Sequence, residues 1–98
     1  MRVAQNYEGD FILIRNTSGN NVDAFVSKYG GSGDDSWFPV GDSFAGSAAK
    51  WSRSSWEVVV FRDRANNNKR VGRYINAHGK TTQITFRSFE NIEIVTSD

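Results

Sequence analysis

The sequence predicts an all-β fold, an antiparallel β-sandwich of about seven strands. Short segments rich in β-branched and aromatic residues recur along the chain, with clusters of Gly, Asn and Ser between them. No window of about 12 residues carries apolar side chains at helical spacing. The chain has 98 residues, 38% of them apolar and 23% charged, which suits one folded domain over residues 1–98.

The first two expected strands flank a turn. Residues 11–15 are a compact apolar run, and residues 16–21 end it with Asn and Gly, which tolerate positive φ. Residues 22–29 are rich in β-branched and aromatic side chains, although the adjacent Phe25 and Val26 must face opposite sides.

A glycine-rich loop over residues 30–36 precedes the third strand. Residues 37–40 are expected to form a short edge strand, because Pro39 has no amide hydrogen to donate to a neighbouring strand. Residues 41–49 are small and polar, which is typical of a loop.

The fourth and fifth strands form a hairpin. Residues 55–62 have a continuous apolar centre, which predicts burial on both faces and a central position in the sheet. Residues 63–69 contain three consecutive Asn and connect this strand to residues 70–76.

The last two strands follow a turn at residues 77–80. Residues 81–87 form the first of them, and residues 91–95 form the second, with Ile92 and Ile94 on one face at a period of two.

Composition argues against several functional classes. There is no Cys, and His78 is the single histidine, so neither a thiolate zinc site nor a histidine-based triad is available. We expect no catalytic residues, no cofactor and no metal. The amino terminus has no apolar segment typical of a signal peptide, so we expect a protein that is cytoplasmic or released without a signal peptide.

The glycine-rich loop ends in a pattern that suits sugar recognition. Asp34 and Asp35 precede Trp37 closely. Carboxylates accept hydrogen bonds from vicinal hydroxyls, an indole covers the apolar C–H patch of a pyranose, and glycines allow the backbone to approach the ligand. A plain loop with Trp37 in the core is the alternative.

The segment before the hairpin adds two candidates. If the strand begins near residue 55, Trp56 enters the core and Trp51 lies in the preceding loop as an exposed platform. Arg53 is then the neighbouring hydrogen-bond donor. The alternative is that both tryptophans cap the core and Arg53 is solvated.

The hairpin over residues 62–73 is basic, with five Lys or Arg against one Asp. It could contact phosphates, but the formal net charge of the whole chain is only +1, so a solvated hairpin is the preferred interpretation and no nucleic-acid partner is expected. The Asn run offers amides that suit hydroxyl-rich ligands, with Asn68 as the candidate contact.

Residues 24–29, 35–40, 51–62 and 72–74 together resemble the small hemagglutinins of mushroom fruiting bodies, which are short fungal chains without cysteine or signal peptide. The resemblance implies a β-sandwich that binds sugars, self-assembles and agglutinates cells.

The leading hypothesis is therefore a non-enzymatic lectin that binds glycans or glycoconjugates through Asp34, Asp35, Trp37, Trp51, Arg53 and Asn68. Weak single sites require several copies, so a homo-oligomer is expected, with membranes reached only through surface glycans. The alternatives are a membrane-active, cytolysin-like toxin and a nucleic-acid binder that uses the basic hairpin.

Overall fold

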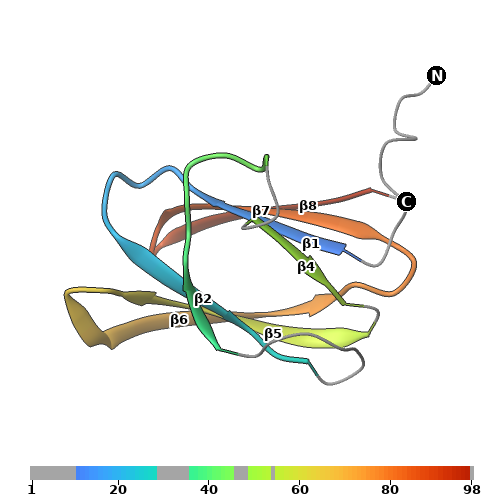
Figure 1. Ribbon diagram of the computed structural model, residues 1–98, viewed down its shortest axis with the longest axis horizontal. Helices are drawn as coiled ribbons and strands as arrows, with labels where there is room; N and C mark the ends of the chain where they lie inside the picture. The colour runs from blue at the N-terminus through green and yellow to red at the C-terminus, as the bar shows by residue number, and fades with distance from the viewer. Residues whose placement is uncertain (1–10, 29–35, 46–48, 54, 98) are drawn as a thin grey trace.

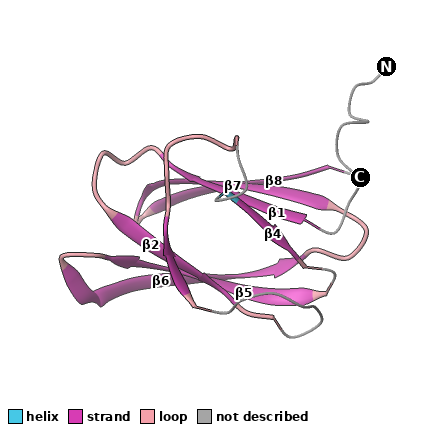
Figure 2. Cartoon of the chain, in the orientation of Figure 1, coloured by secondary structure: helices cyan, strands magenta, loops and turns pink. Residues whose placement is uncertain are grey.

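The computed structural model describes residues 11–28, 36–45, 49–53 and 55–97. These residues form β-strands joined by loops, which confirms the all-β prediction (Figure 2). The strands are β1 (Phe11–Asn16), β2 (Val22–Val26), β3 (Trp37–Pro39), β4 (Lys50–Ser52), β5 (Trp56–Asp63), β6 (Asn66–Asn76), β7 (Thr81–Ser88) and β8 (Asn91–Ser97). Among the described residues, no helix has both the length and the apolar character needed to cross a membrane.

The strands form two sheets of four, with the orders β4-β1-β7-β8 and β3-β2-β5-β6, which lie as two layers in Figure 1. The structure thus has eight strands where the sequence predicts about seven. The additional strand is β4, in which Trp51 pairs with Ile12 of β1. A single apolar residue between Lys50 and Ser52 gives no periodic pattern, so this strand was not predicted.

The pairing of β1 with β7 is parallel, whereas every other strand pair is antiparallel. The prediction of a purely antiparallel fold is therefore wrong for this pair. Ile12, Leu13 and Ile14 are all buried, although they alternate between the two faces of β1. A continuous apolar run with both faces covered is typical of a parallel strand, and this property distinguishes β1 from a half-exposed antiparallel strand.

One hydrophobic cluster comprises side chains from both sheets. Phe61 of β5 and Phe86 of β7 meet in it with ring centroids 4.9 Å apart, and both are almost fully buried. Because these residues belong to different sheets, their contact joins the two layers. The cluster thus lies between the sheets, and the other face of each sheet points away from it.

β5 occupies a central position between β2 and β6, as predicted. Its burial alternates, however: Val59 and Phe61 are buried, while Trp56 and Val58 are exposed. The expectation that both faces of this strand are buried is therefore wrong, and the outer face of the β3-β2-β5-β6 sheet carries apolar side chains.

Candidate functional site

The predicted site residues differ in their burial and contacts, and two of them are not described. Asp34 and Asp35 lie outside the described residues. Asn68 is exposed in the first part of β6, where its backbone N–H donates to Oδ1 of Asn66 over 3.1 Å. Its side chain therefore remains on the surface of the hairpin.

Trp37 is half-buried on β3, the edge strand next to β2. Its ring packs against Phe25 with centroids 5.6 Å apart. The guanidinium carbons of Arg62 and Arg70 lie 4.2 and 5.4 Å from the ring centroid, which is cation–π distance. The indole is thus partly covered by its own protein and is not a free platform.

Trp51 is 7% exposed, so the expectation that it forms an exposed platform is wrong. Its ring contacts Phe38 of the other sheet in an edge-on arrangement with centroids 6.4 Å apart. The physical reason is that Trp51 pairs with Ile12, whose side chain enters the core, and directly opposite residues share one face of a sheet.

Arg53 is 2% exposed, so it is neither a donor on the surface nor a solvated side chain. Its guanidinium donates to the backbone carbonyls of Ser27 (2.6 Å), Ser52 (2.8 Å) and Val26 (3.2 Å). Ser52 ends β4 and Val26 ends β2, so this side chain joins the two sheets. A residue that sequence reasoning assigned to binding thus stabilises the fold.

The exposed aromatic side chains lie on the outer face of the β3-β2-β5-β6 sheet. Trp56 is 48% exposed and Tyr74 is 67% exposed, and their ring centroids lie 4.8 Å apart at an interplanar angle of 34°. The register pairs Val58 with Tyr74, so Trp56 is the diagonal neighbour of Tyr74 on the adjacent strand. We refer to Trp56, Val58 and Tyr74 as the aromatic face.

Sequence reasoning assigned Trp56 to the core and missed this face. The even-numbered apolar residues of β5, including Trp56 and Val58, point outward, and the odd-numbered ones, including Val59 and Phe61, point inward. Since both sets are apolar, the alternation gives no indication of which set faces the core. Glu57 belongs to the inward set and is buried, but a carboxylate normally indicates the exposed face, so the sequence favours the opposite assignment.

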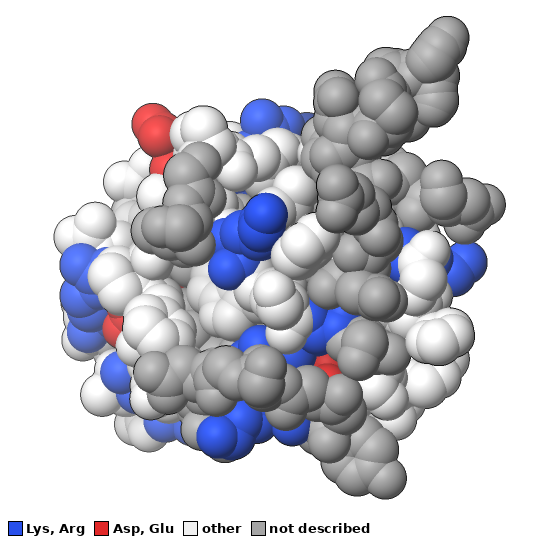
Figure 3. Space-filling view, turned by 45° about the vertical axis from the view of Figure 1, so that its right-hand side comes forward, with Lys and Arg blue, Asp and Glu red and all other residues white. Residues whose placement is uncertain are grey.

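An arginine pair lies farther along the same outer face. Arg62 of β5 is directly opposite Arg70 of β6 in the register, and both lie over Trp37. Asp23 of β2 pairs with Arg62 (3.3 Å) and with Arg64 (3.1 Å). In Figure 3, basic side chains gather over the lower part of the molecule, with few acidic side chains beside them.

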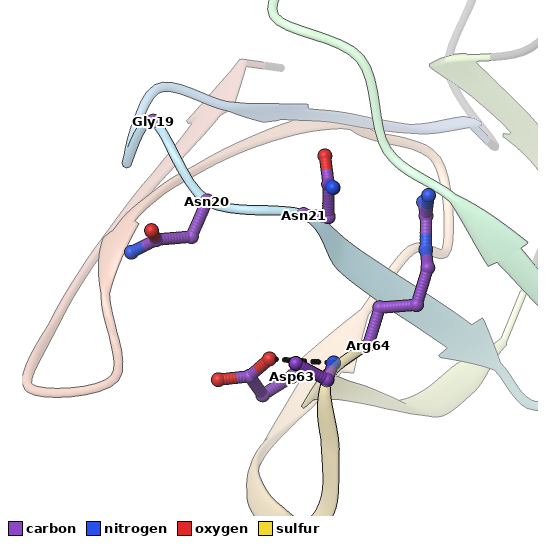
Figure 4. A pocket seen from close by; sticks show the side chains of 6 residues that line it. Gly19, Asn20, Asn21, Asp63 and Arg64 are labelled. Carbon is purple, nitrogen blue, oxygen red and sulfur yellow. Dashed lines mark hydrogen bonds between the residues drawn. The ribbon is translucent and has the colours of Figure 1, made fainter.

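A polar hollow of about 500 Å³ lies where the β1–β2 turn approaches the end of β5 (Figure 4). Asn20 and Asp63 reach it from these two elements, and Asp63 Oδ1 accepts a hydrogen bond from the Ala65 amide over 2.8 Å. A second hollow of about 480 Å³ shares the turn and includes Asp42. Across the described ranges, no group of three His, Cys, Asp or Glu side chains is placed to hold a metal ion.

The chain was also compared with known proteins. No family model matches it. No curated protein and no solved structure matches it either.

Proposed function

We propose that this protein binds carbohydrate, without catalysis, through the aromatic face. The observation that carries this proposal is the pairing of Trp56 and Tyr74, two large rings that remain about half or more exposed on a regular sheet. A contiguous apolar patch that is exposed on a protein surface often marks an interaction site, whereas single scattered apolar residues do not.

The chemistry of the aromatic face suits a sugar ring. Flat aromatic rings cover the C–H surface of a pyranose, while the Tyr74 hydroxyl and the nearby amide of Asn76, directly opposite Trp56, offer hydrogen bonds to hydroxyl groups. Adjacent strands hold the two rings side by side, so little side-chain freedom is lost when a ligand binds.

The polar hollow is the weaker candidate for the same ligand. Its lining supplies the amides of Asn20 and Asn21 and the carboxylate of Asp63, but no aromatic ring. Binding sites for small ligands combine a few polar groups with a larger apolar or aromatic surface, and the aromatic face offers both.

We further propose that the two layers form a β-sandwich and that several copies assemble into a homo-oligomer. A single shallow face binds one sugar weakly, and several faces on one assembly raise the overall affinity for a glycan-covered surface. This arrangement is what a hemagglutinin requires.

A glycan array tests the proposal with the wild type and the variants Trp56→Ala and Tyr74→Ala. Val95→Ala is the matched control, because Val95 is an exposed apolar residue (50%) on β8 of the other sheet. We expect wild type and control to retain neutral glycans, and each aromatic variant to lose about tenfold in affinity, the effect of removing an aromatic anchor. Failure of the wild type to retain any glycan, or equal retention by Trp56→Ala, contradicts the proposal.

The exposed Trp and Tyr also suit a lipid–water interface, so a membrane-active protein is the competing interpretation. Dye release from liposomes distinguishes the two. Leakage that depends on Trp56 and that free sugars do not suppress favours the membrane interpretation, whereas the lectin proposal predicts no leakage from vesicles without glycolipid.

A further inference from the structure

We infer that the glycan is acidic, and that Arg70, with Arg62 beside it, binds a sulfate or carboxylate group of the saccharide that rests on the aromatic face. This inference depends on the proposed function, because it adds the ligand's charge to the same surface. Three features of this surface support it: the arginine pair, the charges around the pair, and a glycine between the pair and the aromatic rings.

The arginine pair places two like charges directly opposite each other on neighbouring strands. Such a cross-strand pair destabilises a sheet unless an anion or another group offsets the repulsion. Trp37 partly does so, since both guanidinium groups lie over its ring. An anion that bridges both guanidinium groups would offset the remaining repulsion.

Among the described residues, the carboxylates nearby do not balance these charges. Asp23 pairs with both Arg62 and Arg64. The Nε of Arg70 donates to the backbone carbonyl of Asn67 over 2.6 Å, and in the described part of the chain no carboxylate lies within ion-pair distance of Arg70. The two Nη groups of Arg70 are thus available for the bidentate contact that guanidinium makes with sulfate or carboxylate.

Gly72 lies on β6 between Tyr74 and Arg70, with its side-chain position on the same outer face. A Cβ there would meet the Val59 carbonyl oxygen and the Val60 Cγ2 at 3.6 Å, which is ordinary contact, and the backbone needs no positive φ. The fold therefore has room for a Cβ at this position. A glycine inside a strand marks a bulge, a tight bend, or the close approach of a ligand or another backbone. Gly72 pairs with Val60 in regular register, away from the register shift between Arg62 and Asp63, which favours the approach of a ligand.

These features lie along one line of β6. Tyr74 and Arg70 are four positions apart along the strand, a rise of about 13 Å, and Gly72 lies halfway between them. An oligosaccharide that stacks on the rings can cross this gap and present an acidic group to Arg70. A nucleic acid requires several phosphate contacts along a charged track. Of the other basic residues of the hairpin, Arg64 pairs with Asp23 and Lys69 lies over the Phe89 ring, and the formal net charge of the chain is only +1.

Biolayer interferometry with immobilised heparin, chemically desulfated heparin and a neutral glucan tests the inference, with single-stranded DNA as competitor. Arg70→Gln removes one guanidinium, and Arg87→Gln is its matched control, with the same charge change on β7 of the other sheet. Gly72→Val is the second variant, because a β-branched residue suits a strand and fills the gap without removing a charge.

We expect wild type and Arg87→Gln to prefer heparin over desulfated heparin, and Arg70→Gln to bind heparin about tenfold more weakly, the loss of a charge-assisted contact. Gly72→Val should show a similar loss and the thermal stability of the wild type or higher. Affinity of Arg70→Gln for the neutral glucan should not change.

Two results overturn this inference but leave the proposed function intact. In the first, the wild type binds neutral glucan and heparin equally well. In the second, heparin binding is unchanged in both Arg70→Gln and Gly72→Val. DNA that competes fully with heparin overturns it in favour of phosphate recognition. Absence of binding to every saccharide refutes the proposed function as well, so the two failures are distinguishable.

Discussion

Replacement of Arg53 by Met measures how strongly one side chain joins the two sheets. Arg53 is 2% exposed, and its guanidinium donates to the carbonyls of Val26, Ser27 and Ser52 over 2.6–3.2 Å. Methionine fills much of the same volume but has no donor. Arg53→Met therefore leaves these carbonyls without the donors that the guanidinium supplies.

The magnitude follows from those three hydrogen bonds. At about 1.5 kcal/mol each, hydrogen bonds from a charged donor sum to about 4–5 kcal/mol. The variant no longer buries a charge, and the desolvation cost that it avoids offsets part of the lost hydrogen-bond energy. The expected loss in the free energy of unfolding is therefore about 3 kcal/mol. A domain of this size has a total of roughly 5–15 kcal/mol, so the variant should fold with a margin reduced by about a fifth or more.

Urea denaturation followed by tryptophan fluorescence measures this loss, and thermal unfolding should show a decrease in Tm of roughly 12–24 °C. Arg53→Lys keeps the charge but lacks the planar fork, so its stability should lie between those of wild type and Arg53→Met. A loss below about 1 kcal/mol in Arg53→Met would refute the claim that this side chain joins the sheets.

Two further predictions concern the core and the β1–β2 turn. Phe61→Ala removes the ring that meets Phe86 across the two layers at 4.9 Å, so it should cost about 3–5 kcal/mol in urea denaturation, while Val95→Ala, at an exposed site, should stay within about 0.5 kcal/mol of wild type. Gly19 has φ +85° and open space around its Cβ position, so Gly19→Ala should cost about 1 kcal/mol from backbone strain alone. Gly41→Ala is the control, since Gly41 also has open space but no positive φ, and an unchanged or higher stability is expected there; equal losses at both glycines would contradict the backbone explanation.

Local patterns in the sequence were sufficient to predict the class of the fold. Val22–Val26 and Thr81–Ser88 contain the β-branched residues that favour strands, and Gly19 has the positive φ expected of the turn between β1 and β2. Pro39 correctly indicated an edge strand. Each of these signals depends on a residue and its immediate neighbours, so it is readable in the chain itself.

The position of the aromatic face needed more than local signals. The sequence predicted an exposed indole, and β5 has apolar residues on both of its faces. Sequence reasoning chose Trp51 as the exposed indole, whereas the structure buries Trp51 against Phe38 and exposes Trp56 beside Tyr74. Similarly, nothing near Arg53 in the sequence indicates that the carbonyls of Val26 and Ser27 receive its hydrogen bonds.

By itself, then, the sequence determined seven of the eight strands and the turns between them. Only the tertiary structure decided the parallel pairing of β1 with β7 and the direction in which each tryptophan points. The physical reason is the two-residue period of a strand: its alternation separates two sets of side chains, but contact with a partner distant in the sequence selects the set that is buried. That selection placed Trp56 and Tyr74 in solvent, on the same sheet face as Arg62 and Arg70.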